Sequence, residues 1–331
     1  MRRSLPVALL ASMAVGSILM LVVGASPGHV WWTMVTRVLG SEYQVGQVLY
    51  KATGLALTGL AVSVALDAGL FNIGGEAQLG AGIFACALVG TALPAGTPAI
   101  VAIPVCTLAA AAAGGAIGGA IGFLRAKRDA HEVITSIMFN AIVAGVVLVE
   151  GSEHIFQGGT TTGPAIVPGA ELPRLPLGGS AANCALFIAI AAVALVWWLR
   201  ARTTWGQAWL AVGRDPDAAR HAGISVARVQ ILVMAGAGAL AGLAATSFVM
   251  GHKHALEEGL GAGTGLLGIV AALLGRLHPV GVGIASLLLG FLSVGGLAVG
   301  DLVPKELTEV LLGVVLLAVA TAAAWERRAA A

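Results

Sequence analysis

Long apolar runs separated by short polar stretches make up most of the chain. A transmembrane helix needs about 20 mainly apolar residues to cross the hydrocarbon core of a bilayer. Nine runs are candidates, namely Leu5–Val23, Leu49–Leu66, Leu79–Leu93, Ala99–Leu124, Val133–Val149, Ala181–Leu199, Val229–Met250, Val280–Val299 and Leu307–Ala324. A tenth run, Gly265–Leu274, is short for a full span and is a candidate half-helix or tilted segment. The pattern predicts an all-α, polytopic transmembrane bundle of about ten helices (8–10), forming one domain over residues 1–331.

The distribution of Lys and Arg predicts the orientation, because basic residues concentrate in cytoplasmic loops. With the N-terminus in the cytoplasm, thirteen of the 18 basic residues fall at inner helix ends, namely Arg2, Arg3, Arg125, Lys127, Arg128, Arg200, Arg202, Arg214, Arg220, Arg228, Arg276, Arg327 and Arg328. The outer ends keep Arg37, Lys51, Arg174, Lys253 and Lys305. We therefore expect both termini inside. Residues 151–179, rich in Gly, Pro and Thr, then form an external loop or cap.

Residues 200–228 form the longest stretch on the cytoplasmic side and contain signals for a short helix. Asp215 is a good N-cap, Pro216 suits the first helical turn, and Gly223 suits a C-terminal stop. We expect a surface helix of roughly two turns from about Pro216 to Ala222. Such a helix is too short and too polar to span a membrane, and is a candidate docking element for another protein.

Composition supports a membrane protein and excludes an ordinary soluble domain. Hydrophobic residues make up 58% of the 331 residues and charged residues 10%, whereas a soluble domain carries about 25% charged residues. One globular core cannot bury that excess, but a lipid-facing surface accommodates it. The 47 glycines fit closely packed transmembrane helices. The three cysteines, Cys86, Cys106 and Cys184, match neither a zinc site nor a disulfide framework.

A polar segment, Asp67–Gln78, lies between two apolar runs with almost no polar linker. Its Gly-Gly pair permits a break in the helix, which can expose backbone groups toward a cavity. On a helix beginning there, Asn72 and Glu76 would share one face. Two interpretations stay open. The segment is either a tight cytoplasmic turn with Glu76 near the headgroups, or part of a substrate pathway that includes Asn72, Glu76 and Gln78.

A second polar group, Glu132, Ser136 and Asn140, follows the spacing i, i+4 and i+8 and therefore lies on one face of a helix. Asn140 is the deepest of the three. Its side chain either forms a hydrogen bond between helices, worth about 1 kcal/mol or less in membranes, or contacts substrate directly. Ser136 and Asn140 complete the set of candidate pathway residues.

Signatures of catalysis and of metal binding are missing from the sequence. None of the four lysines follows a glycine, so the chain has no Gly-x-x-x-x-Gly-Lys phosphate-binding loop. The polar run His252–Glu258 has two histidines at i, i+2 without a third ligand, which favours a solvated loop over a metal site. We therefore expect a transport subunit without a cofactor or metal. If ATP drives the transport, another chain binds the nucleotide.

Four segments together resemble a known family, the ABC importer permeases of the nucleoside, or basic-membrane-protein, class. That class belongs to the group containing ribose and branched-chain amino-acid permeases. Gly69–Gln78 resembles its G-L-F-N-I-G-x-E-G-Q signature, and Glu132–Asn140 is similar to its E-V-I-x-T-x-M-L-N segment. Arg214–Gly223 looks like its N-P-x-A-A-x-x-A-G-I loop, and Gly275–Pro279 resembles its G-R-x-N-P turn. The matches run in order from about Leu49 to Gly300 and cover most of the chain.

The sequence departs from the family pattern at three positions. Ala77 stands where the signature has Gly, and Asp215 and His278 each stand where the pattern has Asn. The acidic-Leu-Ser pattern that ribose-type permeases often carry at the first segment is absent. The resemblance therefore favours nucleosides over simple sugars as the substrate.

The resemblance implies one permease subunit of an importer in the inner (plasma) membrane. Two permease chains, identical or paired with a sister chain, would form the pathway, two ATPase subunits would bind ATP, and a lipoprotein or periplasmic protein would deliver substrate. The loop that docks on the ATPase would contain the coupling residues Asp215, Pro216, Ala218, Ala219 and Gly223. Movement of this helix would tilt the bundle and alternate access to the pathway.

Two other classes of function compete with this interpretation. A secondary transporter driven by protons or sodium would carry acidic residues near the bilayer midplane, whereas the expected topology places Glu76 and Glu132 near helix ends. An embedded enzyme would need a nucleophile-and-base pair or a metal cluster, and the sequence shows neither.

Overall fold

The structure, a computed structural model, describes residues 4–156, 160–304, 310 and 313–314. In this part of the chain the helices are α1 (Ser4–Val22), α2 (Pro27–Leu39), α3 (Glu42–Asp67), α4 (Gly75–Ala92), α5 (Ala99–Arg128), α6 (Glu132–Glu150), α7 (Ala185–Arg202), α8 (Thr204–Arg214), α9 (Pro216–His221), α10 (Val226–Leu243), α11 (Thr264–Leu274) and α12 (Pro279–Ala298). Short elements complete the chain, namely η1 (Gly151–Ile155), β1 (Thr162–Ala165), η2 (Pro168–Ala170), η3 (Thr246–Lys253) and β2 (Ala255–Glu257). The all-α transmembrane prediction is confirmed as a mostly helical, polytopic bundle.

Each predicted apolar run inside the described residues forms a helix, because the backbone must satisfy its own hydrogen bonds in lipid. The run Leu307–Ala324 lies outside them. Six described helices are long and apolar enough to cross a membrane, or up to seven if α1 and α2, bent by 113°, count as one span. Helix α4 is not among the six, and its first turn carries Glu76 and Gln78. α11 has 11 residues, as expected for a half-helix.

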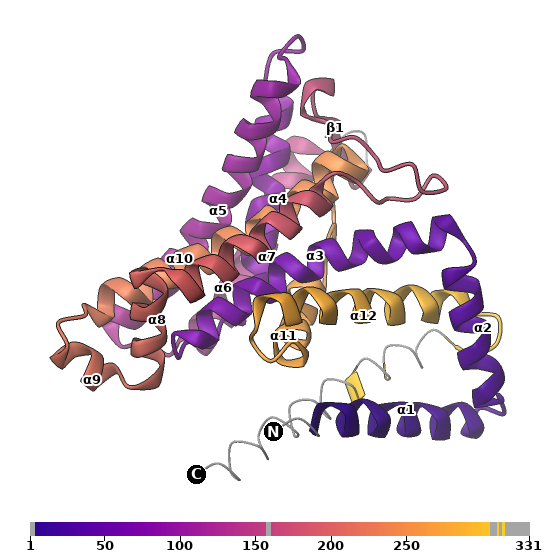
Figure 1. Cartoon of the computed structure of the whole chain (residues 1–331). Coiled ribbons are helices and arrows are strands. Elements are labelled where there is room, and N and C mark those ends of the chain that lie inside the picture. Colours follow the sequence, from indigo (N-terminus) through magenta and orange to yellow (C-terminus); the bar gives the residue numbers. More distant parts are fainter. Residues whose placement is uncertain (1–3, 157–159, 305–309, 311–312, 315–331) are drawn as a thin grey trace.

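The sequence did not predict helix α2, which crosses the end of α1 at a steep angle (Figure 1). It is amphipathic and only 13 residues long, so its residues do not form a long apolar run. Arg37, in its last turn, donates to both carboxylate oxygens of Asp301, just after α12 (2.5 and 2.9 Å). This hydrogen bond lowers the pKa of the exposed Asp301 carboxyl below its ordinary value.

Helix α3 lies at the centre of the bundle, against α7, α10, α11 and α12 (Figure 1). In its most apolar 18-residue window 83% of the residues are buried, against 11% in the corresponding window of α6. α6 therefore lies at the edge of this chain, with a row of exposed apolar side chains that includes Ile134, Ile137 and Ile142.

Helices α5 and α10 pack through glycines. Gly114 and Gly118 on α5 face Gly238 and Gly242 on α10, and a Cβ atom at Gly238 would collide with the carbonyl oxygen of Gly114. Both pairs have the four-residue spacing of small residues that lets transmembrane helices approach backbone to backbone. These glycines therefore set the separation of the two helices.

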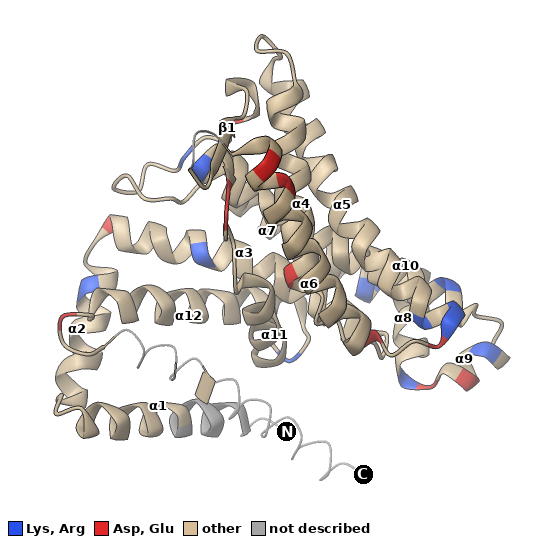
Figure 2. Cartoon of the chain, turned by 180° about the vertical axis from the view of Figure 1, so that it is seen from behind, with Lys and Arg blue, Asp and Glu red and all other residues tan. Residues whose placement is uncertain are grey.

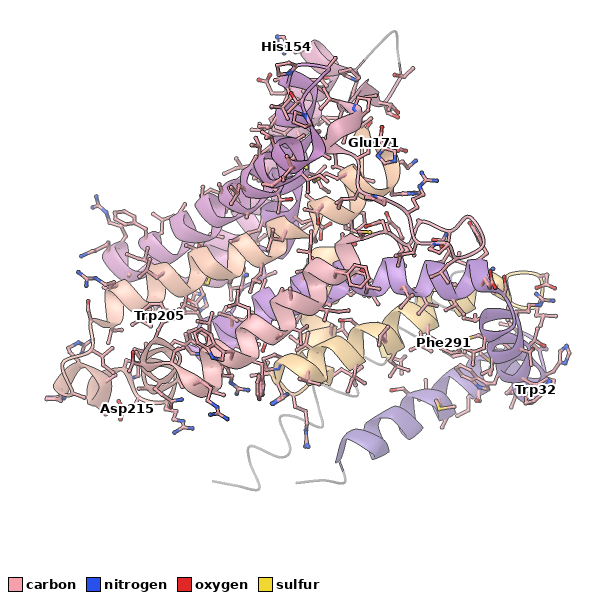
Figure 3. The ribbon with its side chains drawn as sticks, turned by 45° about the horizontal axis from the view of Figure 1, so that its top comes forward. Trp32, His154, Glu171, Trp205, Asp215 and Phe291 are labelled. Atoms are coloured by element: carbon pink, nitrogen blue, oxygen red, sulfur yellow. The ribbon has the colours of Figure 1, made fainter. Side chains whose placement is uncertain are left out.

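The bundle has two ends that differ in chemistry. Strand β1 pairs antiparallel with β2 at one end, here called the β1 end, where His154 and Glu171 lie (Figure 3). The other end, here called the α9 end, carries α8 and α9 with Trp205 and Asp215 (Figure 3). Lys and Arg gather around α8, α9 and the adjacent ends of α5 and α10 (Figure 2).

Candidate functional site

Residues 68–74, which connect α3 to α4, form an irregular segment and not a tight turn. Helix α3 ends at Asp67, and Gly69, with φ +75°, adopts the left-handed conformation that closes a helix C-terminus. Residues 70–73 are non-helical, and α4 begins at Gly75. The prediction that Asn72 and Glu76 share a helical face is therefore wrong, because Asn72 lies before the helix begins.

Asn72 and Gln78 form a reciprocal pair of amides in the fully buried interior. The Asn72 Nδ2 donates to Gln78 Oε1 (2.9 Å), and Gln78 Nε2 donates to Asn72 Oδ1 (3.0 Å). Asn72 Oδ1 also accepts from the Gly74 backbone N–H (3.1 Å). Both side chains are 0% exposed. Their polar atoms are thus used in fixing the bend before α4, and neither residue lines the pocket described below.

Glu76 connects the beginnings of two helices. Its Oε1 accepts from the Gly263 N–H (2.5 Å) and its Oε2 from the Gly265 N–H (2.9 Å), at the N-terminus of α11. A carboxylate there satisfies donors that have no partner inside the helix and interacts favourably with the helix dipole. A Cβ atom at Gly265 would collide with the Glu76 backbone nitrogen, so glycine allows the two helix starts to touch.

The contacts of α3 place Glu76 relative to the two ends of α11. Helix α3 descends toward the α9 end beside α11: Thr58 Oγ1 donates to the Thr264 carbonyl (3.1 Å), and Ser63 Oγ donates to the Leu277 carbonyl (2.7 Å). Glu76 lies at the level of Thr264, separated from the turn after α11 by the length of that helix, about 16 Å at 1.5 Å per residue. Glu76 therefore lies in the first turn of α4, beside the start of α11. Its depth in the bilayer stays a prediction.

The polar face of α6 lies against the segment between α3 and α4. Asn140 Oδ1 accepts from the Ala77 N–H (2.9 Å), and its Nδ2 donates to the Ile73 carbonyl (3.1 Å). Glu132 lies 3.4 Å from the Arg125 guanidinium at the end of α5. Ser136 is buried, and its Oγ has no hydrogen-bond partner among the described residues. Of the two interpretations of Asn140, the hydrogen bond between helices is present, and contact with substrate stays a prediction.

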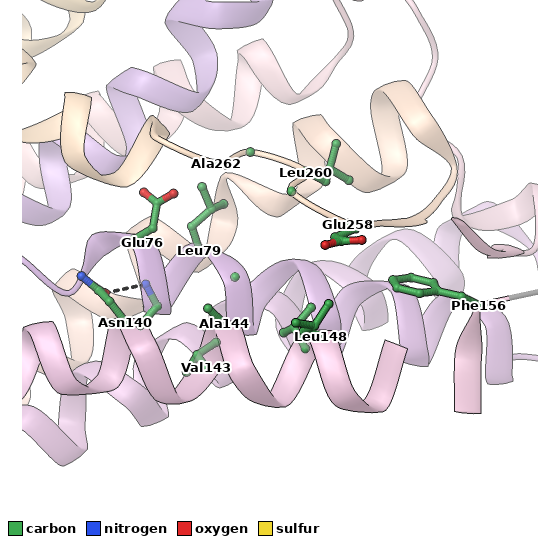
Figure 4. A pocket seen from close by; sticks show the side chains of 15 residues that line it. Glu76, Leu79, Asn140, Val143, Ala144, Leu148, Phe156, Glu258, Leu260 and Ala262 are labelled. Atoms are coloured by element: carbon green, nitrogen blue, oxygen red, sulfur yellow. Dashed lines mark hydrogen bonds between the residues drawn. The ribbon is translucent and has the colours of Figure 1, made fainter. Parts of the chain in front are cut away.

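A pocket of about 310 Å³ lies between α4, α6 and the loop before α11 (Figure 4). Glu76, Ala77 and Asn140 line one end, and Phe156 and Glu258 lie toward the other. Apolar side chains of α6, including Val143 and Leu148, line much of the wall. Two of the five candidate pathway residues, Glu76 and Asn140, therefore line this pocket, whereas Asn72, Gln78 and Ser136 do not.

The predicted surface helix is present as α9, Pro216–His221, with Pro216 in its first turn. Asp215 caps it, because its Oδ1 accepts from the backbone N–H groups of Asp217 (2.9 Å) and Ala218 (3.0 Å). Ala218 is exposed, whereas Ala219 is 3% exposed and packs inward. Gly223 has φ +82° and ends the helix as expected. The sequence did not predict α8, which precedes α9 within the same loop.

The end of α8, just before α9, touches the end of α3. Asp67 forms an ion pair with Arg200 at the end of α7 (2.8 Å between Arg200 Nε and Asp67 Oδ2). Gly213, two residues before the cap of α9, lies so close that a Cβ atom would collide with the Asp67 carbonyl oxygen. Asp67 and Arg200 each begin a segment that the sequence analysis singles out. Nothing in the sequence indicates that these residues, 133 positions apart, would pair.

Among the described residues no group of three His, Cys, Asp or Glu side chains could hold a metal ion. The three cysteines are free. His252 lies within η3, with its ring centroid 5.0 Å from that of Tyr50, so the run beginning there is partly helical and packed. Neither a metal centre nor a disulfide is assigned to this part of the chain.

The sequence is similar to ABC transporter permeases over almost its full length. It is 34% identical to the guanosine ABC transporter permease protein of Bacillus subtilis over 95% of this chain and 92% of the relative. It is 33% identical to a glucose ABC transporter permease protein of Haloferax volcanii (96% and 87%) and 30% identical to a nucleoside ABC transporter permease protein of Lactococcus lactis (95% and 89%). No solved structure matches the chain.

The family comparison agrees with these relatives. Residues 44–320 match the family described as "Branched-chain amino acid transport system / permease component". This range includes the segment between α3 and α4, the pocket and α9. The chain belongs to this family and is a multi-pass membrane permease subunit of an ABC importer.

Proposed function

We propose that the chain forms half of the translocation pathway for nucleosides, or for related simple sugars. The observation that carries this proposal is the similarity over almost the full length to permeases named for guanosine and for nucleosides. The glucose permease among the relatives keeps simple sugars as the second candidate. The polar groups along α4 and α6 fit a polar solute better than an apolar one.

The five candidate residues divide into two proposed roles. Glu76 and Asn140 line the pocket, so they would face a solute at its deep end. Asn72 and Gln78 would hold the bend that brings Glu76 to that depth. Ser136 is buried with an unpaired hydroxyl, which would be free to form a hydrogen bond when the bundle changes shape.

The proposed topology keeps about ten transmembrane helices in one domain over residues 1–331, with both termini in the cytoplasm and the chain in the inner (plasma) membrane. The gathering of Lys and Arg at the α9 end supports an inward-facing α9 end. The β1 end, with residues 151–179, would then face outward. Glu76 would lie inside the bilayer, where both of its oxygens cap α11, as a structural carboxylate and not an ion carrier.

The proposed partners are an ABC ATPase, a second permease chain and a substrate-binding lipoprotein or periplasmic protein. The ATPase would bind ATP and grip the coupling segment, which contains Asp215, Pro216, Ala218, Ala219 and Gly223. Because Ala218 is exposed and Ala219 packs inward, Ala218 would touch the ATPase and Ala219 would seat α9 on its own chain. This chain itself would have no enzymatic activity and no cofactor.

ATP-driven uptake in proteoliposomes tests the proposal. The permease is reconstituted with its ATPase and substrate-binding partners, and uptake of radiolabelled guanosine, uridine and glucose is measured. We expect nucleoside uptake that needs ATP and persists when ionophores collapse ion gradients. Ala218→Asp should reduce co-purification of the ATPase, whereas Ala95→Asp, at an exposed position between α4 and α5, serves as the matched control. Uptake that needs an ion gradient and no ATPase would overturn the assignment.

A further inference from the structure

The outer portion of the pocket combines an aromatic ring and a carboxylate from two distant segments. Phe156 follows η1, and Glu258 follows β2. The two segments are joined by backbone pairing, because Thr162 opposes Glu257 in the small sheet and the Glu258 N–H donates to the Thr161 carbonyl (3.0 Å). The sheet therefore brings both side chains to the same pocket, at the end away from Glu76 and Asn140 (Figure 4).

Glu258 differs from the other polar side chains of the pocket because its carboxylate is uncommitted. The polar atoms of Glu76 and Asn140 form hydrogen bonds with backbone groups. The neighbouring Glu257 pairs with Lys253 at 2.6 Å. Within the described ranges, Glu258 has no side-chain hydrogen bond or ion pair, and it is exposed. A solute entering the pocket would find this carboxylate free to accept hydrogen bonds.

The chemistry of the two side chains matches the two halves of a ribonucleoside. Nucleobases stack on aromatic rings, and this contact tolerates any base because every base has a π face. Carboxylates of Asp and Glu accept hydrogen bonds from ribose hydroxyls, as in dinucleotide-binding folds. The volume of about 310 Å³ lies at the lower end of the range for small-molecule pockets. An apolar wall with few polar groups is also typical of such sites.

We propose that the β1 end of this pocket is a ribonucleoside subsite, in which Phe156 stacks on the base and Glu258 accepts hydrogen bonds from the 2′ and 3′ hydroxyl groups. This inference rests on the proposed function and adds a specificity-determining role for two residues. A nucleoside without these hydroxyls would leave the Glu258 carboxylate unpaired beside it, and would therefore gain less from the site.

The test compares uridine with 2′,3′-dideoxyuridine in proteoliposomes that contain the whole importer. Initial ATP-driven uptake is measured for the wild type, for Glu258→Gln and for the matched control Glu257→Gln. Each rate is divided by the wild-type rate for the same substrate, which cancels the preference of the binding protein. We expect Glu258→Gln to slow uridine about tenfold, as for loss of a hydrogen bond to a charged group, and to slow dideoxyuridine little. Glu257→Gln should not alter the preference.

The ring is tested with Phe156→Leu, which keeps an apolar side chain, against Phe156→Tyr, which keeps the aromatic face. Loss of stacking should slow uridine uptake about tenfold in the leucine variant only. Co-purification of the ATPase reports assembly, and Glu258→Ala repeats the carboxylate test with a second side chain. If uridine is transported but Glu258→Gln and Glu258→Ala slow both substrates equally or neither, the subsite is wrong. If the wild type transports no nucleoside, the proposed substrate itself is wrong.

Discussion

The guanidinium of Arg200, at the end of α7, holds the carboxylate of Asp67, at the end of α3, through two contacts. Arg200 Nε lies 2.8 Å from Asp67 Oδ2, and Arg200 Nη2 donates to Asp67 Oδ1 at 3.1 Å. The side chains are 26% and 8% exposed, respectively. Because Gly213, near the end of α8, packs on the Asp67 backbone, the pair lies beside the end of the helix that leads into α9. A displacement of α9 would therefore be transmitted to α3 at this point.

The first prediction concerns the strength of the Asp67–Arg200 pair. Removing one partner leaves a largely buried charge without compensation, which is strongly destabilising. Asp67→Ala and Arg200→Ala should each lower the free energy of unfolding. The sum of the two losses should exceed the loss in the double variant by a coupling free energy of roughly 1–3 kcal/mol. Denaturation of the purified permease in detergent gives the four values of this cycle.

The pair formed by Asp217 and Arg220 on α9 is the control for that cycle. Its side chains are 78% and 64% exposed, so water screens the interaction. Its coupling free energy should fall within the few tenths of a kcal/mol that are typical of exposed pairs. Equal coupling in the two cycles would show that the burial of Asp67 has no energetic consequence.

The second prediction concerns transmission from α9 to α3. Gly213→Ala introduces a methyl group where the Asp67 carbonyl oxygen lies, so α8 must move away from α3. We expect the variant to assemble with the ATPase and hydrolyse ATP, but to move fewer substrate molecules per ATP than the wild type. Gly145→Ala on α6, where nothing lies within 4 Å of the added atom, is the control. A wild-type ratio in Gly213→Ala would exclude this contact as the route of coupling.

The helices could be predicted from the sequence because the residues that make up an apolar run also form the helix. Apolar runs such as Val280–Val299 coincide with helix α12 to within one residue at each end. The α9 signals were local as well, since Asp215 caps the helix that it immediately precedes. Helix α2 was missed because its Trp and His residues break the apolar run, although its amphipathic pattern was a usable signal.

The arrangement of the candidate site was less accessible to sequence reasoning, because it depends on partners distant along the chain. Glu76 bonds to backbone groups 187 and 189 residues away, and hydropathy reports a position along the chain without its depth. The bend before α4 leaves Asn72 outside the helix, so Asn72 and Glu76 do not share the helical face that the sequence predicted. No local pattern indicated that Glu258 would reach the same pocket as Phe156, since the β1–β2 pairing creates that proximity.

The third prediction concerns the packing of α5 against α10. Gly238 lies against the Gly114 backbone, whereas Gly236, two residues earlier on the same helix, has nothing within 4 Å of an added Cβ atom. Gly238→Val should separate the helices and prevent stable folding, because the clash is with backbone atoms of α5 and not with the end of a flexible side chain. Gly236→Val should behave nearly as the wild type. The yield of monodisperse protein in detergent distinguishes the two, and comparable yields would refute glycine-mediated contact.

The fourth prediction separates the two carboxylates of the pocket by what they do. Glu76 satisfies two backbone N–H groups at the start of α11, so Glu76→Ala leaves two partly buried donors unpaired. An unsatisfied donor costs about 1–3 kcal/mol, so the loss of both contacts should lower the free energy of unfolding by about 2–6 kcal/mol. Glu258→Ala removes a side chain that makes no contact of this kind, so the free energy of unfolding should stay within about 0.5 kcal/mol of the wild type.

Glu76→Gln, which keeps one acceptor oxygen, should fall between Glu76→Ala and Glu258→Ala. The same denaturation measurement ranks the three variants. The opposite order would mean that α11 does not depend on the Glu76 cap, and that the deep end of the pocket is held open by other contacts.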